Sequence, residues 1–144
     1  MVQQPAYDFV IDANVLFSCL ISGRKDYLNL FVNYNIATPD FVVDELREHQ
    51  DVILKKTRLP ADRFHEFAAR IFKDITIIPN FLISTQYYFQ AFLLCRDIDP
   101  DDTSYLALAL QYDVPLLTRD KLLVDGLRAR GYTNVILLDE LFSQ

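Results

Sequence analysis

The chain has 144 residues, of which 51% are hydrophobic, and its formal net charge at pH 7 is −6. This length predicts one domain over residues 1–144, and the apolar content excludes a disordered chain and a coiled coil. The negative charge argues against a protein that holds nucleic acid through a basic surface, although bound metal ions could supply positive charge locally.

The first half of the chain alternates apolar runs with helical patterns. Residues 7–12, "YDFVID", predict a buried strand, and residues 13–22 predict a helix that ends at Gly23. A second helix is predicted over residues 26–34 and a second strand over 35–39. From Asp40, a good cap residue, the pattern predicts one long amphipathic helix to residue 57, and another helix follows over 59–72.

The second half repeats this alternation. A strand is predicted over residues 75–79, helices over 83–96 and 102–112, a strand over 114–118, a helix over 121–131 and a last strand over 134–138. The strands are solid apolar runs, which is typical of a parallel sheet buried on both faces. The sequence therefore predicts an α/β fold, a three-layer α/β/α sandwich with a central parallel sheet of about five strands.

Composition and chain order also bear on the compartment. Cys19 and Cys95 each lie in an apolar helical segment, which favours buried free thiols over a disulfide or a metal pair. The first ten residues lack the basic and long apolar regions of a signal peptide. The longest uncharged run contains Pro79 and Asn80, which argues against a membrane span. We therefore expect a cytoplasmic protein.

Acidic residues gather where predicted strands end and predicted helices begin. Asp12 closes the first strand, Asp120 follows the fourth, and Asp102 opens the helix before that fourth strand. Glu45 lies beside the apolar stripe of the long helix. Because sites in open parallel sheets form beyond the carboxyl ends of the strands, we expect these carboxylates to meet at one edge.

Each acid, taken singly, has a structural explanation. The three aspartates are good helix caps, Glu45 fits a solvated position, and Asp97 and Asp99 fit a loop beside a proline. Capping accounts for one carboxylate at each helix start, but not for the run of acids over residues 97–102. Carboxylates that meet at one buried edge repel unless a cation lies among them, and hard divalent cations prefer oxygen ligands. The pattern as a whole therefore favours a divalent metal site.

Three segments resemble, in order, the motifs of PIN-domain nucleases: "FVIDANVLFSCL", "TPDFVVDELREH" and "DPDDTSYLALALQYDVPLLTRD". The resemblance implies a PIN-like fold and a catalytic, metal-binding acidic quartet of Asp12, Glu45, Asp102 and Asp120. It places four further residues around this quartet, Asn14, Thr118, Asp99 and Asp101. Asn14 and Thr118 would orient the carboxylates, whereas direct binding of the ion by Asp99 or Asp101 stays open.

The resemblance also implies an activity and partners. A PIN-like ribonuclease would hydrolyse RNA phosphodiester bonds with one or two Mg²⁺ or Mn²⁺ ions and would form a homodimer. Many PIN-domain proteins are the toxins of toxin–antitoxin pairs, so the resemblance also implies an antitoxin protein as a partner. Four residues are candidate RNA contacts: Arg119 and Lys121, which flank Asp120, and Arg24 and Lys25, which lie in the loop after the first predicted helix. Plain surface charge accounts for these four equally well.

Two other functions stay open. A phospho-receiver or a phosphatase that forms an aspartyl-phosphate also places acids at strand ends, but the first strand here ends in the single Asp12. A PIN-like binding module would keep the acids, act through protein partners and use the aromatic segment over residues 81–92 as a contact surface.

Overall fold

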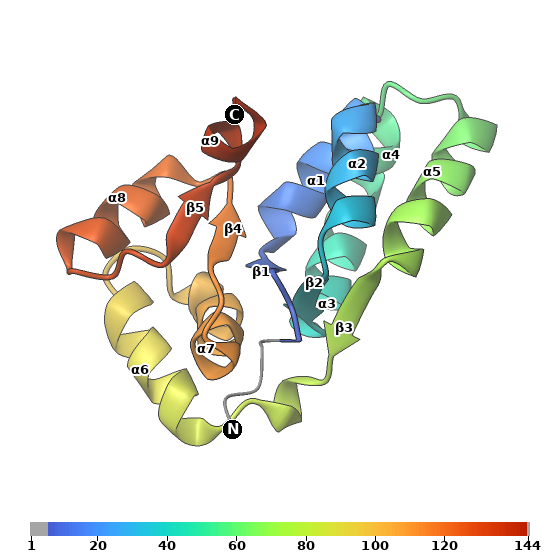
Figure 1. Cartoon of the computed structure of the whole chain (residues 1–144). Helices are drawn as coiled ribbons and strands as arrows, with labels where there is room; N and C mark the ends of the chain where they lie inside the picture. The colour runs from blue at the N-terminus through green and yellow to red at the C-terminus, as the bar shows by residue number, and fades with distance from the viewer. Residues whose placement is uncertain (1–5, 144) are drawn as a thin grey trace.

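The computed structural model describes residues 6–143 and shows a five-stranded parallel sheet between two layers of helices (Figure 1). The strands lie in the order β3-β2-β1-β4-β5. Their bounds are Phe9–Ile11 for β1, Ile36–Pro39 for β2, Ile75–Ile78 for β3, Leu116–Thr118 for β4 and Val135–Leu137 for β5. The predicted three-layer α/β/α sandwich is therefore confirmed.

The helices before β3 pack together on one face of the sheet, and α6 to α8 pack on the other (Figure 1). The first group comprises α1 (Ala13–Ser22), α2 (Lys25–Asn33), α3 (Phe41–Glu48), α4 (Gln50–Lys56) and α5 (Ala61–Lys73). The second comprises α6 (Thr85–Cys95), α7 (Thr103–Tyr112) and α8 (Lys121–Ala129). Two 3₁₀ turns, η1 (Asn80–Leu82) and η2 (Pro100–Asp102), precede α6 and α7, and α9 (Leu138–Phe142) follows β5.

The predicted long helix over residues 40–57 is wrong, because the structure divides it into α3 and α4 at His49. His49 has φ −103° and ψ 12°, and its Nδ1 lies 2.9 Å from the carbonyl oxygen of Glu45. Its ring also packs against Phe17, with ring centroids 5.0 Å apart. The backbone N–H of His49 still donates to the carbonyl oxygen of Glu45 at 3.1 Å, so the chain bends at His49 without losing this bond, and α4 packs against α1.

The expected cap at Asp40 is also wrong, because the side chain makes no cap hydrogen bond to α3. Instead, Asp40 Oδ1 accepts the backbone N–H of Asn80 at 3.1 Å and joins the start of α3 to the chain beyond β3. Gly23 does end α1, with φ 63° in the left-handed region that glycine adopts readily. The short helix α9 was not predicted.

The strands β1, β2 and β4 are buried on both sides, as their apolar runs predict, whereas Thr76 and Ile77 of the edge strand β3 are exposed. Val10 and Ile11 of β1 and Leu116 and Leu117 of β4 are fully buried, and the apolar face of α7 covers them. Cys19 and Cys95 are buried free thiols, which confirms that prediction. Among residues 6–143, every helix is too short or too polar to cross a membrane.

The sheet order creates one switch point, at the carboxyl ends of β1 and β4. These neighbouring strands pair in parallel, but the chain leaves β1 toward one helical layer and leaves β4 toward the other. Ligand sites in open α/β sheets form at such points, because the diverging connections leave a crevice between them. Asp12 and Asp120 follow these two strands.

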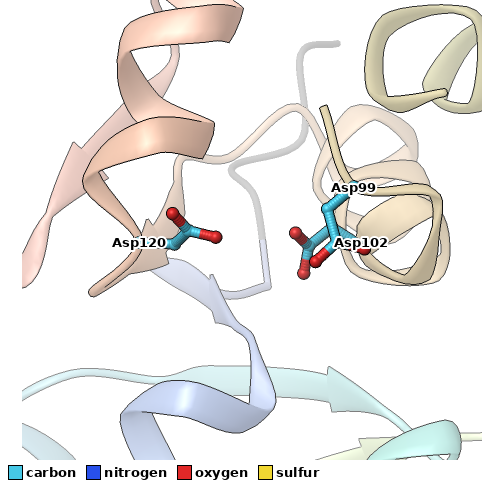
Figure 2. Close-up of side chains that lie close together, drawn as sticks. All are labelled: Asp99, Asp102 and Asp120. Atoms are coloured by element: carbon cyan, nitrogen blue, oxygen red, sulfur yellow. The ribbon is translucent and has the colours of Figure 1, made fainter. Parts of the chain in front are cut away.

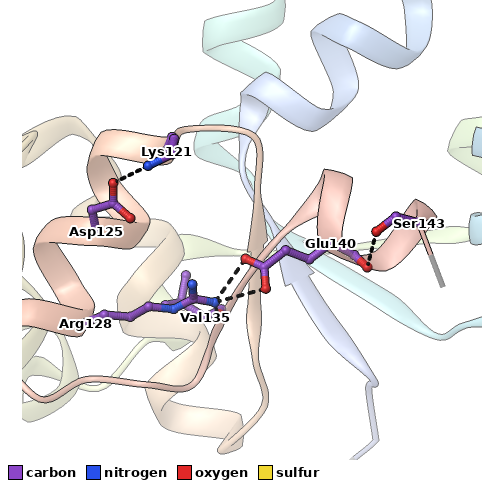
Figure 3. Close-up of polar contacts among 6 residues, drawn as sticks. All are labelled: Lys121, Asp125, Arg128, Val135, Glu140 and Ser143. Carbon is purple, nitrogen blue, oxygen red and sulfur yellow. Dashed lines mark hydrogen bonds and ion pairs between the residues drawn. The ribbon is translucent and has the colours of Figure 1, made fainter.

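The last turn of α8 is held by Arg128. Its guanidinium donates to the carbonyl oxygen of Val135 at 3.2 Å and to the carboxylate of Glu140 at 3.1 Å (Figure 3). These bonds join α8, β5 and α9. The end of α8, rather than the start that carries Asp120, is therefore held against β5.

Candidate metal centre

Asp12 is held in place by both of its oxygens. Oδ1 accepts the backbone N–H of Val15 at 3.3 Å, which caps α1, and Oδ2 accepts the hydroxyl hydrogen of Thr118. Thr118 Oγ1 in turn accepts the backbone N–H of Asp120 at 3.1 Å. Asp12 is 1% exposed and Thr118 0%, so one buried hydroxyl fixes both the Asp12 carboxylate and the loop that carries Asp120.

Three other carboxylate groups meet across the switch point. Asp120 approaches from the start of α8, whereas Asp99 and Asp102 approach from the loop and the 3₁₀ turn before α7 (Figure 2). One oxygen from each of these three residues lies within 4.8 Å of the other two. Asp120 also caps α8, because its Oδ1 accepts the N–H of Leu123 at 3.1 Å. Carboxylate oxygens grouped in this way are suited to a hard divalent cation.

Asp102 provides the clearest sign that the group takes a cation. The residue is 7% exposed, and its Oδ2 has no hydrogen-bond partner within the described part of the chain. A buried carboxylate oxygen without a donor is destabilising, since water has been removed and nothing replaces it. A metal ion or a proton supplies the missing partner.

The electrostatics of the site agree with this reading. Burial, and then the charges of Asp12, Asp99, Asp120 and Glu45, raise the pKa of Asp102 to about 8. Burial, with smaller contributions from Asp120 and Glu45, raises the pKa of Asp12 to about 7 against the opposing hydrogen bond from Thr118. Without an ion, the site therefore holds protons near neutral pH, and an ion that binds must displace them.

Glu45 reaches the site from α3, in the opposite helical layer. Tyr105 of α7, which is 1% exposed, donates its hydroxyl to Glu45 Oε1. Burial raises the pKa of Glu45, the bond from Tyr105 opposes that rise, and Asp101 adds to it. A small cavity of about 90 Å³ opens here and is lined by Ala13, Asn14, Glu45, Asp99, Asp101, Asp102 and Tyr105.

Tyr105 is a site residue that sequence reasoning missed. It lies within the apolar run "SYLALAL" of a predicted helix, where nothing in the pattern sets it apart from its apolar neighbours. The available signal was its spacing, because Tyr105 is three residues after Asp102 and therefore lies on the same side of α7. A tyrosine hydroxyl that is buried needs a partner, and the nearest acid provides one.

The structure brings the four expected residues to one edge of the sheet, but only two of them belong to the group of closely spaced carboxylates. Asp102 and Asp120 belong to the three-carboxylate group. Asp12 and Glu45 lie outside this group, and each accepts a hydrogen bond from a neighbouring hydroxyl, Asp12 from Thr118 and Glu45 from Tyr105. Asp99, which was expected among the surrounding residues, belongs to the group itself.

The other expected residues lie farther out. Asn14 and Asp101 are exposed on the rim of the cavity. The four cationic candidates lie outside the lining of the cavity: Arg24 pairs with Asp26, Arg119 donates to Ser18, Lys121 pairs with Asp125 at 2.7 Å (Figure 3), and Lys25 opens α2.

Comparison with known proteins gives one match. A family model described as PIN domain matches residues 10–138, from β1 to the first residue of α9. This span includes every carboxylate of the centre described above. A search of the curated proteins finds no match to the chain.

Proposed function

The chain belongs to the PIN-domain family, whose members are generally nucleases, and from this premise we propose that it is a single-domain, metal-dependent endoribonuclease that hydrolyses RNA phosphodiester bonds. The observation that carries the proposal is the buried Asp102 oxygen without a partner, which lies within a group of carboxylates at the switch point of the sheet. Oxygen donors of this kind suit Mg²⁺ or Mn²⁺.

The proposed metal ligands and catalytic residues are Asp12, Glu45, Asp102 and Asp120. One or two ions bound among them would supply Lewis acidity, which polarises a phosphoryl oxygen and makes water more acidic. The protein itself supplies positioning. Thr118 fixes Asp12, and Tyr105 fixes Glu45. Asp12 and Asp102 are buried away from bulk water, whereas Glu45 and Asp120 are half-buried.

RNA binding would rely on the ions and on a few side chains, because the chain as a whole carries a net charge of −6. We propose that Arg24, Lys25, Arg119 and Lys121 contact the phosphate backbone. Arg119 supports this role by its position, since it donates to Ser18 of α1 and joins the loop after β4 to the first helix. Arg119 and Lys121 support the proposal because they flank Asp120 in the chain.

We also propose that the protein works in the cytoplasm as a homodimer and is controlled by an antitoxin protein. Apolar surface supports such pairing. Large apolar side chains on η1 and α6 are exposed, most strongly Phe81 at 84%, and Phe89 and Phe92 share this surface. Elsewhere on the protein, a largely apolar groove of about 470 Å³ lies between α3, α4 and α5, and a groove of this kind suits an amphipathic partner helix.

Cleavage of a mixed single-stranded RNA by the ion-free full chain, with Mn²⁺ added back, tests the proposal. We expect Asp102→Asn to reduce the cleavage rate by about a hundredfold or more, because it removes a negative charge that would bind the ion. The control is Asp97→Asn, an exposed acid that pairs with Arg130 at 3.3 Å and should cleave like the wild type. Cleavage that needs no metal, or that survives in Asp102→Asn, contradicts the proposal.

A binding module is the second candidate, and the exposed apolar surface of η1 and α6 favours it. Such a module would pair with a protein partner whether or not its carboxylates are intact. A wild-type chain that binds no Mn²⁺ and cleaves no RNA, yet pairs through α6, would support this candidate instead.

A further inference from the structure

Asp99 is fixed by the backbone of the loop that joins α6 to α7. The backbone N–H groups of Ile98 and Asp99 both donate to the carbonyl oxygen of Cys95 at 2.8 Å. Asp99 Oδ1 accepts the N–H of Asp101 at 3.0 Å and so starts the η2 turn. The half-buried side chain faces Asp120 across the switch point, beside Asp102 (Figure 2).

Shaping this turn does not require a charge. Asparagine or serine would accept the same backbone N–H and would begin the turn as well. A carboxylate at this position instead adds a negative charge next to Asp102, which is already 93% removed from solvent. Like charges at this separation repel, so a carboxylate at Asp99 destabilises the folded protein unless a positive charge lies between the two residues.

The second observation concerns which oxygens are free to bind. Both oxygens of Asp12 accept hydrogen bonds. Glu45, Asp99 and Asp120 each have one oxygen that accepts a hydrogen bond and a second that accepts none within residues 6–143. Asp102 Oδ2 is buried and has no partner within residues 6–143, and the oxygens that approach one another within 4.8 Å come from Asp99, Asp102 and Asp120.

We propose that Asp99 is a direct ligand of the divalent ion, together with Asp102 and Asp120. The inference rests on the proposed function and deepens it, because it adds a fifth carboxylate to the expected quartet. Asp97 provides the contrast: it lies two residues earlier in the same loop but points outward to Arg130, with 3.3 Å between the charged atoms. The loop thus directs one acid to the surface and the other to the ion.

Titration of the ion-free full chain with Mn²⁺, followed by the electron paramagnetic resonance signal of the free ion, tests the proposal without any need for catalysis. Asp99→Asn keeps an acceptor for the turn and removes the charge, and Asp99→Ser also removes the oxygen that could still reach the ion. We expect both variants to weaken Mn²⁺ binding by about tenfold or more. Asp97→Asn is the matched control and should change the affinity by less than about twofold, because an exposed ion pair contributes little.

The outcomes separate this inference from the proposed function. If Asp99→Asn and Asp99→Ser bind Mn²⁺ as tightly as the wild type while Asp102→Asn does not, the ion site stands and Asp99 is only a turn residue. If the wild type itself binds no Mn²⁺, the proposed function fails and this inference fails with it. Circular dichroism of each variant shows that it is folded, and Asp99→Ser serves as the second test if Asp99→Asn is not.

Discussion

The ion-free protein is expected to become more stable as the pH falls from about 7 to about 5.5. Burial raises the pKa of Asp12 to about 7 and that of Asp102 to about 8, both from 3.8. Between these pH values the folded chain therefore holds protons that the unfolded chain has released. Stability falls as the pH rises wherever the folded state binds more protons than the unfolded state.

The size of the effect follows from the number of protons involved. Each of the two carboxyls changes the free energy of unfolding by up to about 1.4 kcal/mol per pH unit, and by less as the pH approaches its own pKa. Between pH 5.5 and pH 7, the two carboxyls together change the free energy of unfolding by about 4 kcal/mol. For a domain of this size that corresponds to a change in melting temperature on the order of 10 °C.

Urea denaturation followed by circular dichroism, in the presence of a chelator, measures this dependence. Asp102→Asn should remove about half of the pH dependence and should be more stable than the wild type at pH 7, because it carries no charge to bury. Saturating Mn²⁺ should stabilise the wild type most at the higher pH, where the ion displaces the fewest protons. An ion-free wild type whose stability is constant or rises between pH 5.5 and pH 7 would refute the reasoning.

Three further changes follow from the same centre. Thr118→Val should unfold more easily than Thr118→Ser by about 2 kcal/mol in urea above pH 7, because it leaves a buried charged oxygen of Asp12 without its hydroxyl donor. Tyr105→Phe should bind Mn²⁺ about tenfold more weakly in a calorimetric titration, because Glu45 loses the hydroxyl that orients it. Asp12→Asn should lose RNA cleavage by about a hundredfold in a gel assay while the ion-free chain becomes more stable.

These three predictions have either a matched control variant or a result that would contradict them. Tyr88, whose hydroxyl lies 3.3 Å from Ser104 Oγ on the same helical layer, is the control for Tyr105, and Tyr88→Phe should leave Mn²⁺ binding unchanged. Equal stability of Thr118→Val and Thr118→Ser would mean that the Asp12 carboxylate does not depend on the hydroxyl. Full cleavage by Asp12→Asn would remove that residue from the catalytic set.

The sheet could be predicted from the sequence because burial on both faces leaves a plain signature. Runs such as Phe9–Ile11 and Leu116–Thr118 are apolar throughout, and each appears as a strand in the structure. The break at His49 could not be predicted in this way, since neither glycine nor proline marks it. His49 instead packs its ring against Phe17 of α1, a tertiary contact, and places its Nδ1 near the carbonyl oxygen of Glu45.

The centre was predictable in outline and not in detail. The positions of Asp12 and Asp120 after strands indicate one edge of the sheet, and both residues turn out to cap helices while facing that edge. The separate explanations of capping and metal binding are therefore compatible for these two. The place of Asp99 depends on how η2 turns, and the role of Tyr105 depends on α3 approaching α7, which no local pattern encodes.

The bond between Asp12 and Thr118 joins residues that are 106 positions apart in the chain. During translation, the ribosome must therefore work for about 5–20 seconds after the first of them is made before the second exists. Until β4 emerges from the exit tunnel, a nascent chain has neither Thr118 nor Asp120 and cannot assemble the centre. If the chain is the proposed metal-dependent nuclease, its centre therefore forms only after residues 12 to 120 have all been made.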